Sequence, residues 1–375
     1  MLVFILLVGS FLRFYNLLWG DGFFFHPDEN NMARAIAQMT PEKGLNPEFF
    51  AYGQLPLYLA YFSAQIFLLI SGQVASKSLD FSLQPVPFEM AVFWLRFWSA
   101  SASVAGMYLV YLIARTLLTK RYALLATLAT AATPGLIQAA HFGTTESFLT
   151  FFFLLILYLC IRIIQNKSDI HTSNRLFVLL GMVFGLSTGI KLTSIYFVVP
   201  LILTLFVHFL YIRPLRQSFL PLYMVLLLAL TGTSAIFGYI ISSPYNLISY
   251  FDFKSSMSYE IGVAQGLDVF YTRQFYETVP YLFQMQHIFP YVLGWPLFVF
   301  GSTGLLYILI NLIRRIIHHS AAKKAPLYIM SILAISFFSF VIFTSMLYVK
   351  WTRFLTPVFP LYSLFFAIMA AWAIP

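Results

Sequence analysis

Long apolar segments separated by short polar connectors run through the whole of this 375-residue sequence. A helix needs about 20 apolar residues to cross a bilayer, so the pattern predicts an all-α polytopic membrane protein. No internal repeat or low-complexity stretch is visible. Eleven apolar segments can be distinguished, at about 1–19, 55–72, 89–117, 122–140, 146–164, 176–190, 193–211, 218–242, 289–312, 326–348 and 357–374.

Basic residues gather in the short connectors between some of these segments. Lys and Arg are retained on the cytoplasmic side of membrane proteins, so we place these connectors in the cytoplasm. They contain one acid, Asp169, and the other acids of the chain then fall on the opposite side. The basic residues are Arg115, Lys120, Arg121, Arg162, Lys167, Arg175, Arg213, Arg216, Arg314, Arg315, Lys323 and Lys324.

This orientation requires that one segment does not cross. Segment 55–72 has Pro56 near its start and several polar residues, and we expect it to lie in or dip into the outer interface. The prediction is a single transmembrane domain over 1–375 with about ten spans and both ends in the cytoplasm. Two large outer loops remain, at 20–88, with juxtamembrane helices, and at 243–288.

Composition agrees with a membrane protein. The chain is 60% hydrophobic and 9% charged, against about 25% charged in soluble proteins. The net charge of +9 follows from topology, so we expect membrane lipids and no nucleic acid as partners. The single Cys160 lies in an apolar segment, which argues against thiol catalysis. The first segment lacks a basic lead and a cleavage site, and we interpret it as a retained helix. The chain ends at "AAWAIP" directly after a helix, as the core of a longer protein would.

The stretch "FFFHPDENN", residues 23–31, follows the first apolar segment and carries polar chemistry. Met32, Ile36 and Met39 then recur at helical spacing, which predicts a short helix with Pro27 at its first position. In the simpler interpretation, the two acids of this stretch only stabilise the helix N-terminus.

The alternative is that Asp28 or Glu29 is a general base. A carboxylate close to an acceptor hydroxyl can take its proton while a bond forms at a sugar carbon. Nucleotide sugars are absent outside the cytoplasm, so the donor would be lipid-linked, with a phosphate at the headgroup level. Such a site needs cations near the outer surface.

Four basic residues meet this requirement. Arg13 lies in the outer half of the first segment, and Lys191 lies in the outer turn "GLSTGIKLTS". Lys350 and Arg353 stand together in "YVKWTRFLTP". Long basic side chains near helix ends also extend to headgroups without a specific role. Four cations on the face that carries the acidic pair favour phosphate binding.

A third acid, Glu146, begins the segment "ESFLTFF", with His141 shortly before it. Thr144 or Thr145 could cap this helix and Glu146 could merely favour its dipole. Alternatively, Glu146 faces the pocket and binds the acceptor or a metal. No cofactor is indicated apart from a divalent cation, for which the spacing matches no specific motif; its ligands would come from His26, Asp28, Glu29, His141 and Glu146.

Several motifs, in order, resemble GT-C glycosyltransferases of the protein O-mannosyltransferase and aminoarabinose-transferase branch (dolichyl-phosphate-mannose-protein mannosyltransferase-like). In that branch an L-R-x-x-x-L motif precedes H-x-D-E, and a G-x-x-x-x-x-K-x-T turn precedes a late R-[YF]-x-x-P-x-x-P helix. The resemblance covers nearly the whole chain. The matching stretches are "FLRFYNLLWGDGFFFHPDENNMARA", "YGQLPLYLAYF", "HFGTTESFLTFFFLL", "GLSTGIKLTSIYFVVPLIL", "SSPYNL" and "KWTRFLTPVFPLYSLFFA".

The resemblance implies that Asp28 is the catalytic base and that Glu29 assists it or positions the acceptor. It also implies that Lys191 and Arg353, and more weakly Arg13, bind the polyprenyl or dolichyl phosphate. H-P-D-E equally resembles the lipid-intermediate mannosyltransferases of the same fold, which leaves the acceptor class open.

We therefore expect a glycosyltransferase that moves a mannose-like hexose or a pentose from a polyprenyl-phosphate donor to a protein, lipid or glycan acceptor, with inversion. His26, His141 and Glu146 are candidates for acceptor or sugar binding, as are Tyr271, Arg273 and Gln274 of the second outer loop. The expected location is the plasma membrane of a prokaryote, with an extracytoplasmic site. A transporter or flippase would need charges near the midplane and two matching halves; a non-catalytic scaffold would tolerate loss of Asp28.

Overall fold

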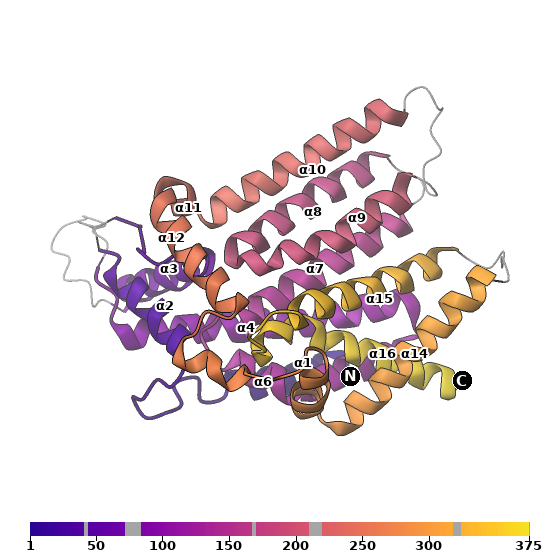
Figure 1. Ribbon diagram of the computed structural model, residues 1–375, viewed down its shortest axis with the longest axis horizontal. Coiled ribbons are helices and arrows are strands. Elements are labelled where there is room, and N and C mark those ends of the chain that lie inside the picture. Colours follow the sequence, from indigo (N-terminus) through magenta and orange to yellow (C-terminus); the bar gives the residue numbers. More distant parts are fainter. Residues whose placement is uncertain (41–43, 72–83, 167–169, 210–219, 318–323, 375) are drawn as a thin grey trace.

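The computed structural model describes residues 1–40, 44–71, 84–166, 170–209, 220–317 and 324–374, and these form a bundle of helices without a β-strand (Figure 1). The all-α prediction is confirmed over this part of the chain. Lys167, Arg213, Arg216 and Lys323 of the predicted cytoplasmic connectors lie outside the described residues. The α-helices are α1 (Leu2–Phe14), α2 (Pro27–Gln38), α3 (Leu55–Ile70), α4 (Phe88–Leu117), α5 (Lys120–Ala132), α6 (Pro134–Ala140), α7 (Glu146–Gln165), α8 (Ile170–Ile190), α9 (Val198–Val207), α10 (Leu220–Ser242), α11 (Tyr245–Ile248), α12 (Tyr250–Gln265), α13 (Phe289–Leu293), α14 (Trp295–Ile317), α15 (Lys324–Ser345) and α16 (Phe359–Ala373).

Shorter 3-10 and π turns join several of these helices. The stretches η1 (Leu192–Phe197) and η5 (Thr352–Val358) lead directly into α9 and α16, and η3 (Phe270–Phe275) follows α12. A π-turn, η4 (Gln284–Ile288), precedes α13. Each of η1 and η5 thus forms an irregular first turn at one end of an apolar helix, α9 or α16, where side chains can converge.

Fewer helices are long enough to cross a membrane than the ten that were predicted. Seven in the described chain have the length and apolar composition of a span, or eight if the α5–α6 pair counts as one. The other two predicted spans correspond to shorter apolar helices, α1 and the η1–α9 unit at Leu192–Val207. Segment 55–72, which was predicted to lie at the interface, is the 16-residue helix α3. The protein is a multi-pass integral membrane protein.

The predicted segment 122–140 is broken into α5 and α6, which meet at an angle of 58°. Pro134 is the first residue of α6, and the preceding Thr133 has extended backbone. Proline disfavours helical backbone in the residue before it and has no N–H for the helix ladder, which accounts for the bend.

Helices α8 and α10 pack closely along a line of small residues. Gly181, Gly185 and Gly189 recur every fourth residue on α8. A Cβ built on Gly185 would lie 1.9 Å from the carbonyl oxygen of Ala235, so no larger residue fits there without displacement of α10. Small residues at this spacing allow helix backbones to approach in membranes.

Helix α7 lies at the centre of the bundle, against α4, α8, α9 and η5. It is apolar on nearly all sides, and most of its side chains are buried, including Cys160. A helix that is apolar all round is expected in such a position. The first residue of this central helix is the acid Glu146.

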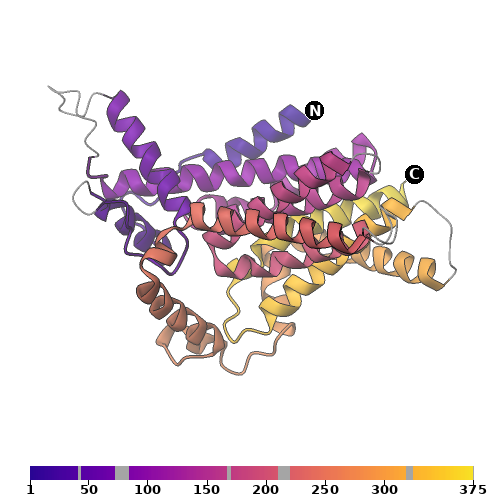
Figure 2. The ribbon, with the colours of Figure 1, turned by 90° about the horizontal axis from the view of Figure 1, so that it is seen from above.

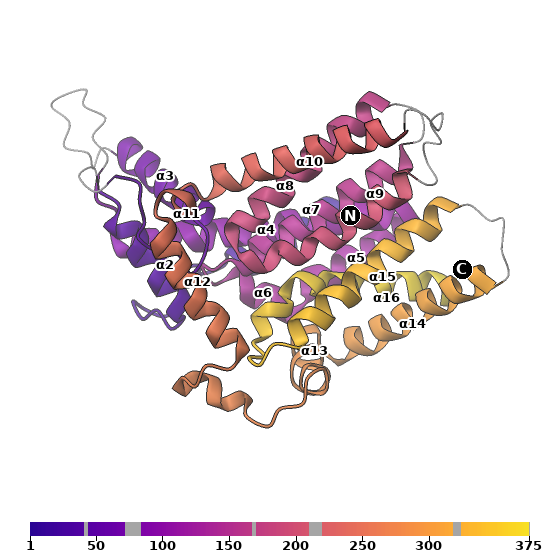
Figure 3. The same ribbon diagram turned by 45° about the horizontal axis from the view of Figure 1, so that its top comes forward.

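Both chain termini lie toward the end of the bundle opposite α2, α3 and α12 (Figures 1 and 2). Figure 3 shows α2, α3, α11 and α12 gathered at the other end. The termini thus lie toward the opposite end of the bundle from α2, α3 and α12 (Figures 1 and 3).

Candidate active site

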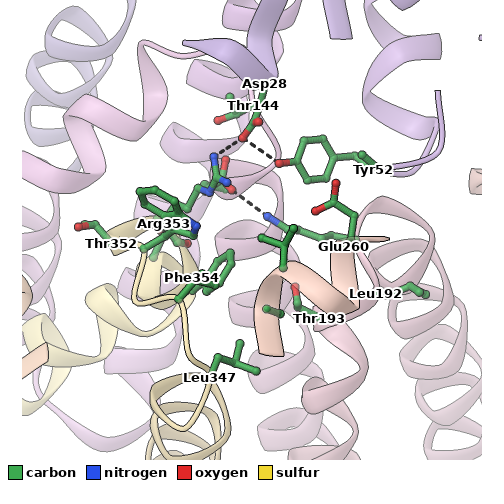
Figure 4. A pocket seen from close by; sticks show the side chains of 18 of the residues that line it. Asp28, Tyr52, Thr144, Leu192, Thr193, Glu260, Leu347, Thr352, Arg353 and Phe354 are labelled. Atoms are coloured by element: carbon green, nitrogen blue, oxygen red, sulfur yellow. Dashed lines mark hydrogen bonds and ion pairs between the residues drawn. The ribbon is translucent and has the colours of Figure 1, made fainter. Parts of the chain in front are cut away.

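A cavity of about 1220 Å³ opens at the end of the bundle that carries α2 and α12. Both large loops and the ends of α7, η1 and η5 contribute to its wall (Figure 4). It is large enough for a sugar with its phosphate and part of an acceptor, because ligand pockets are commonly about 300–1,000 Å³. Six of the residues singled out from the sequence line it: His26, Asp28, Glu146, Lys191, Tyr271 and Arg353.

Asp28 is placed by the start of α2. The predicted apolar stripe is confirmed, since Met32 and Ile36 are fully buried and fix which face of α2 packs inward. His26 caps the helix, and its Nδ1 accepts a hydrogen bond from the Asp28 N–H at 3.3 Å. Burial lowers the pKa of His26, although the nearby carboxylates Asp28 and Glu146 oppose this effect. A neutral imidazole is also what the cap requires, because Nδ1 must be free to accept.

The carboxylate of Asp28 has two partners in the described chain, and both use the same oxygen. The hydroxyl of Tyr52 donates to Oδ2 at 2.8 Å, and a terminal nitrogen of Arg353 donates to the same atom (Figure 4). Burial holds the pKa of Tyr52 well above its usual value. Tyr52 therefore stays protonated and remains a donor, while Oδ1 of Asp28 accepts no hydrogen bond within the described chain.

Lys191 forms a second ion pair in the same cavity. Its Nζ lies 3.2 Å from Oε1 of Glu146 at the start of α7. The ammonium also lies 4.7 Å from the ring centroid of Tyr52 and 5.4 Å from that of Phe354. Two aromatic faces stabilise this cation by cation–π attraction, so its charge stays in place without full hydration.

Arg353 retains an unused donor. Its Nε is buried and has no hydrogen-bond partner among the described residues. A buried N–H without an acceptor is costly, and guanidinium groups bind phosphate oxygens through two parallel bonds. Arg353 and Lys191 thus bring two cations to one cavity, and Arg353 keeps one N–H donor without an acceptor among the described residues.

A tight crossing of three chain segments fixes two of these side chains. The Gly53 N–H donates to the Ile190 carbonyl at 2.7 Å, and Ser243 Oγ donates to the Gly189 carbonyl at 2.6 Å. A Cβ on Gly53 would lie 1.3 Å from the carbonyl oxygen of Gly189, so glycine is required there. Tyr52 and Lys191 directly adjoin this crossing, which explains their fixed separation.

The second outer loop supplies one whole wall of the cavity, through α12 and η3. The hydroxyls of Tyr259 and Tyr271 lie 2.8 Å apart, and Glu260 lines the cavity between them in sequence. The start of this wall is bound to Gln54, whose Oε1 accepts from the Tyr245 N–H at 3.0 Å. Its end is bound through the Tyr348 N–H, which donates to the Ala264 carbonyl at 3.0 Å.

Glu29 does not reach the cavity, which corrects the expectation that it acts beside Asp28. Both its oxygens accept from Arg96 at 2.7 Å, and the two side chains are fully buried. The Gly143 N–H donates to Glu29 as well, so the pair joins α2 and α4 to the turn before α7. Glu29 therefore has a structural position next to the cavity, where it connects the elements that carry Asp28 and Glu146.

Arg13 and Lys350 were expected to hold phosphate, and the structure places both elsewhere. Arg13 is fully buried, and its guanidinium donates to Ser103 Oγ at 2.8 Å and to three carbonyl oxygens. Lys350 donates to the Tyr348 carbonyl at 2.9 Å and does not line the cavity. Backbone carbonyls thus take the role that a phosphate was expected to have.

Three candidates for substrate binding also lie outside the cavity wall. His141 contacts the Ile137 and Tyr15 carbonyls through its two ring nitrogens. Arg273 forms an exposed ion pair with Asp268, and Gln274 donates to the Tyr271 carbonyl. Among the described residues, no group of three His, Cys, Asp or Glu side chains could hold a metal ion. The carboxylates proposed as ligands each face a cation: Asp28 faces Arg353, Glu29 faces Arg96, and Glu146 faces Lys191.

Three residues of the site were not singled out from the sequence: Tyr52, Arg96 and Glu260. A tyrosine in an aromatic-rich loop carries no distinguishing signal. Arg96, by contrast, is a charge within the apolar segment 89–117, and such a residue usually has a buried partner. Glu260 is one of only three acids between residues 243 and 270, and nothing in its neighbours indicates which one faces a cavity.

The family profile described as dolichyl-phosphate-mannose-protein mannosyltransferase matches residues 88–237. No curated protein sequence matches the chain significantly. Among solved structures, the apo oligosaccharyltransferase of Archaeoglobus fulgidus is similar over 98% of this chain and 49% of its own, at 17% identity and a TM-score of 0.61.

Two further solved structures contain bound lipids. The Archaeoglobus fulgidus oligosaccharyltransferase AglB, in complex with an inhibitory peptide and a dolichol-phosphate, is similar over 98% of this chain and 49% of its own, at 15% identity and a TM-score of 0.60. ArnT from Cupriavidus metallidurans, bound to undecaprenyl phosphate, is similar over 100% and 60%, at 18% identity and a TM-score of 0.57. The chain thus spans about half to three-fifths of the length of these structures. It has the GT-C fold and is similar to the dolichyl-phosphate-mannose-protein mannosyltransferases.

Proposed function

We propose that this protein transfers a sugar from a polyprenyl-phosphate donor to an acceptor hydroxyl in the cavity described above. The observation that carries the proposal is the presence in one cavity of a carboxylate, Asp28, and two cations, Lys191 and Arg353. The solved structures with dolichol-phosphate and undecaprenyl phosphate support the class of donor. The family profile favours mannose among the possible hexoses and pentoses.

Lys191 and Arg353 would hold the donor phosphate. The sugar–phosphate link is a diester with one negative charge, and its cleavage leaves a phosphomonoester that carries close to two at neutral pH. Cations fixed where that charge develops stabilise the transition state more than the ground state. The unpaired Nε of Arg353 would bind one of the phosphate oxygens.

Asp28 would act as the general base. Its carboxylate takes the proton of the acceptor hydroxyl while the acceptor oxygen forms a bond to the anomeric carbon and the bond from that carbon to the phosphate oxygen breaks. One displacement from the face opposite the phosphate inverts the anomeric centre. The phosphate would attract Arg353 away from Asp28, and so the donor itself would free the base.

The two outer loops, 20–88 and 243–288, would together form the substrate-binding part of one transmembrane domain. We place this end of the bundle on the extracytoplasmic side, in the plasma membrane of a prokaryote. The basic residues at the opposite end, such as Arg115 and Arg314, favour this orientation. Membrane lipids and an acceptor protein, lipid or glycan would be the other partners.

The direct test is sugar transfer by purified protein in lipid nanodiscs, with hexose and pentose donors on undecaprenyl phosphate and a mixture of peptide, lipid and glycan acceptors. We expect Asp28→Asn to lower the transfer rate by about 10²- to 10⁴-fold, as for loss of a general base. Binding of sugar-free undecaprenyl phosphate should persist. Asp268→Asn, at an exposed site outside the cavity, is the control. Transfer by Asp28→Asn at the wild-type rate would exclude Asp28 as the base.

A further inference from the structure

Glu260 is an acid of the cavity that the proposed reaction does not use. It lies on α12, away from the membrane-spanning helices, and its side chain is half-buried in the cavity wall. Figure 4 shows it extending into the cavity on the side of Tyr52. In the described chain it forms neither an ion pair nor a hydrogen bond through its carboxylate.

Glu260 differs from the other acids of the cavity, each of which is paired with a cation. Asp28 is paired with Arg353, and Glu146 is paired with Lys191. Glu260 is therefore a third carboxylate beside two pairs that already balance. Burial raises its pKa above the ordinary value, although the fields of Lys191 and Arg353 oppose this and that of Asp28 adds to it. Its carboxylate is thus within electrostatic reach of both proposed phosphate ligands.

A phosphate in the cavity brings further negative charge, so Glu260 is unsuited to contact it. What lies next to the phosphate in such a donor is the sugar, whose hydroxyl groups are hydrogen-bond donors. A carboxylate has about four acceptor positions and can receive two adjacent hydroxyls. The wall beside Glu260 also contains the rings of Tyr259 and Tyr271, against which the C–H face of a sugar can pack.

We infer that Glu260 binds hydroxyl groups of the transferred sugar and determines which sugar the cavity accepts. This inference rests on the proposed function and adds a sugar-recognition role for α12. It differs from the catalytic role of Asp28, because Glu260 would contact the sugar without exchanging a proton with the acceptor.

The test compares donors that differ in one hydroxyl. Wild-type protein, Glu260→Gln and Glu260→Leu are assayed with mannosyl-phosphoryl-undecaprenol, with the other hexose and pentose donors, and with single-deoxy analogues of the donor that the wild type uses best. Binding of sugar-free undecaprenyl phosphate is measured in parallel. Asp252→Asn is the matched control, since Asp252 is exposed in the first turn of the same helix.

We expect wild-type protein to discriminate against at least one deoxy analogue by about 10- to 100-fold, the range for a hydrogen bond to a charged group. Glu260→Leu should use that analogue and its parent equally, with a raised KM for the parent, and Glu260→Gln should lie between. Affinity for undecaprenyl phosphate should not change in either variant or in the control.

Unchanged discrimination in Glu260→Leu would overturn the inference and leave the proposed function standing. An equal loss of affinity for the sugar-free lipid would also overturn it, since that result indicates a structural role. Absence of transfer by the wild type with every donor would overturn the proposed function, and this inference with it.

Discussion

The carboxylate of Asp28 and the guanidinium of Arg353 form an ion pair, although 325 positions separate them in the sequence. The pair joins the start of α2 to the 3-10 stretch before α16. It brings together the residue proposed to take a proton and one of the two proposed to hold phosphate. In the proposed reaction the donor phosphate would compete with Asp28 for the charge of Arg353, so donor binding and release of Asp28 would be coupled.

This coupling predicts that Asp28→Asn binds undecaprenyl phosphate more tightly than wild type. Without the carboxylate, Arg353 no longer has to leave a partner, and the affinity should rise several-fold. The affinity of Arg353→Gln for undecaprenyl phosphate should be about 10- to 100-fold lower than that of wild type. Isothermal titration in nanodiscs measures both. Arg273→Gln, which removes an exposed guanidinium outside the cavity, should leave the Kd unchanged. A higher Kd for undecaprenyl phosphate in Asp28→Asn than in wild type would contradict the coupling.

Tyr52 is expected to orient Asp28. Tyr52→Phe removes the hydroxyl that donates to Oδ2 and keeps the ring that lies beside Lys191. The rate of transfer should fall by about tenfold, in line with the loss of one hydrogen bond to a charged group, with little change in donor KM. Steady-state kinetics separate the two parameters. An increase in KM alone would indicate that the hydroxyl binds substrate and does not orient the base.

The buried Glu29–Arg96 pair predicts a loss of stability. Removal of one partner of such a pair leaves an uncompensated buried charge and costs about 3–5 kcal/mol. Glu29→Gln should therefore lower the thermal unfolding temperature markedly. Glu89→Gln, at an exposed acid at the start of α4, should not. If the folded fraction of Glu29→Gln lost transfer without loss of stability, a direct catalytic role for Glu29 would return.

The cap at His26 predicts a dependence of stability on pH. Because its folded pKa is lowered, the unfolded chain binds a proton more readily, and stability falls as pH decreases below the ordinary value of about 6.5. His26→Asn keeps a good N-cap that does not titrate in this range. Its unfolding temperature should change less between pH 7.5 and 5.5 than that of wild type. Equal slopes would show that His26 makes no contribution.

The close packing of α8 against α10 predicts that alanine substitutions at two glycines have different effects on stability. Gly185→Ala places a methyl group against the Ala235 carbonyl, and overpacking of this kind costs about 1–3 kcal/mol. Gly232→Ala on α10 meets nothing within 4 Å, and should be neutral or slightly stabilising because alanine favours helix. Thermal unfolding in one detergent compares the two. Equal melting temperatures would contradict the packing described for α8.

The sequence was sufficient to predict a helical bundle whose candidate site residues gather at one end. Basic connectors predict the orientation, and the apolar stripe through Met32 and Ile36 predicts which face of α2 packs inward. Neighbouring residues on a helix point about 100° apart, so Asp28 and Glu29 meet different surroundings. Only the packing of α2 shows that Asp28 faces the cavity and Glu29 faces Arg96.

The errors at Arg13 and Lys350 have a common cause. The sequence places both cations near the predicted outer surface, but position along a helix does not reveal which backbone carbonyls lie nearby. The Ala131 and Thr130 carbonyls accept from Arg13 in the last turn of α5. Carbonyl groups of a last helical turn lack their i+4 N–H partners, and Pro134 has no N–H to offer Thr130. The break between α5 and α6 thus provides the carbonyl groups that bind the guanidinium of Arg13 on α1.

The wall formed by α12 is tied down at both of its ends, to Gln54 through Tyr245 and to Tyr348 through Ala264. A segment held in this way is poorly suited to swing open as a hinged lid. We therefore expect that residues 250–262, which stop before the buried Val263, can be replaced as a block while both anchors keep their positions. If the proposed function is correct, chimeras made at these two boundaries would change which sugar is transferred while the membrane-spanning helices stay as they are.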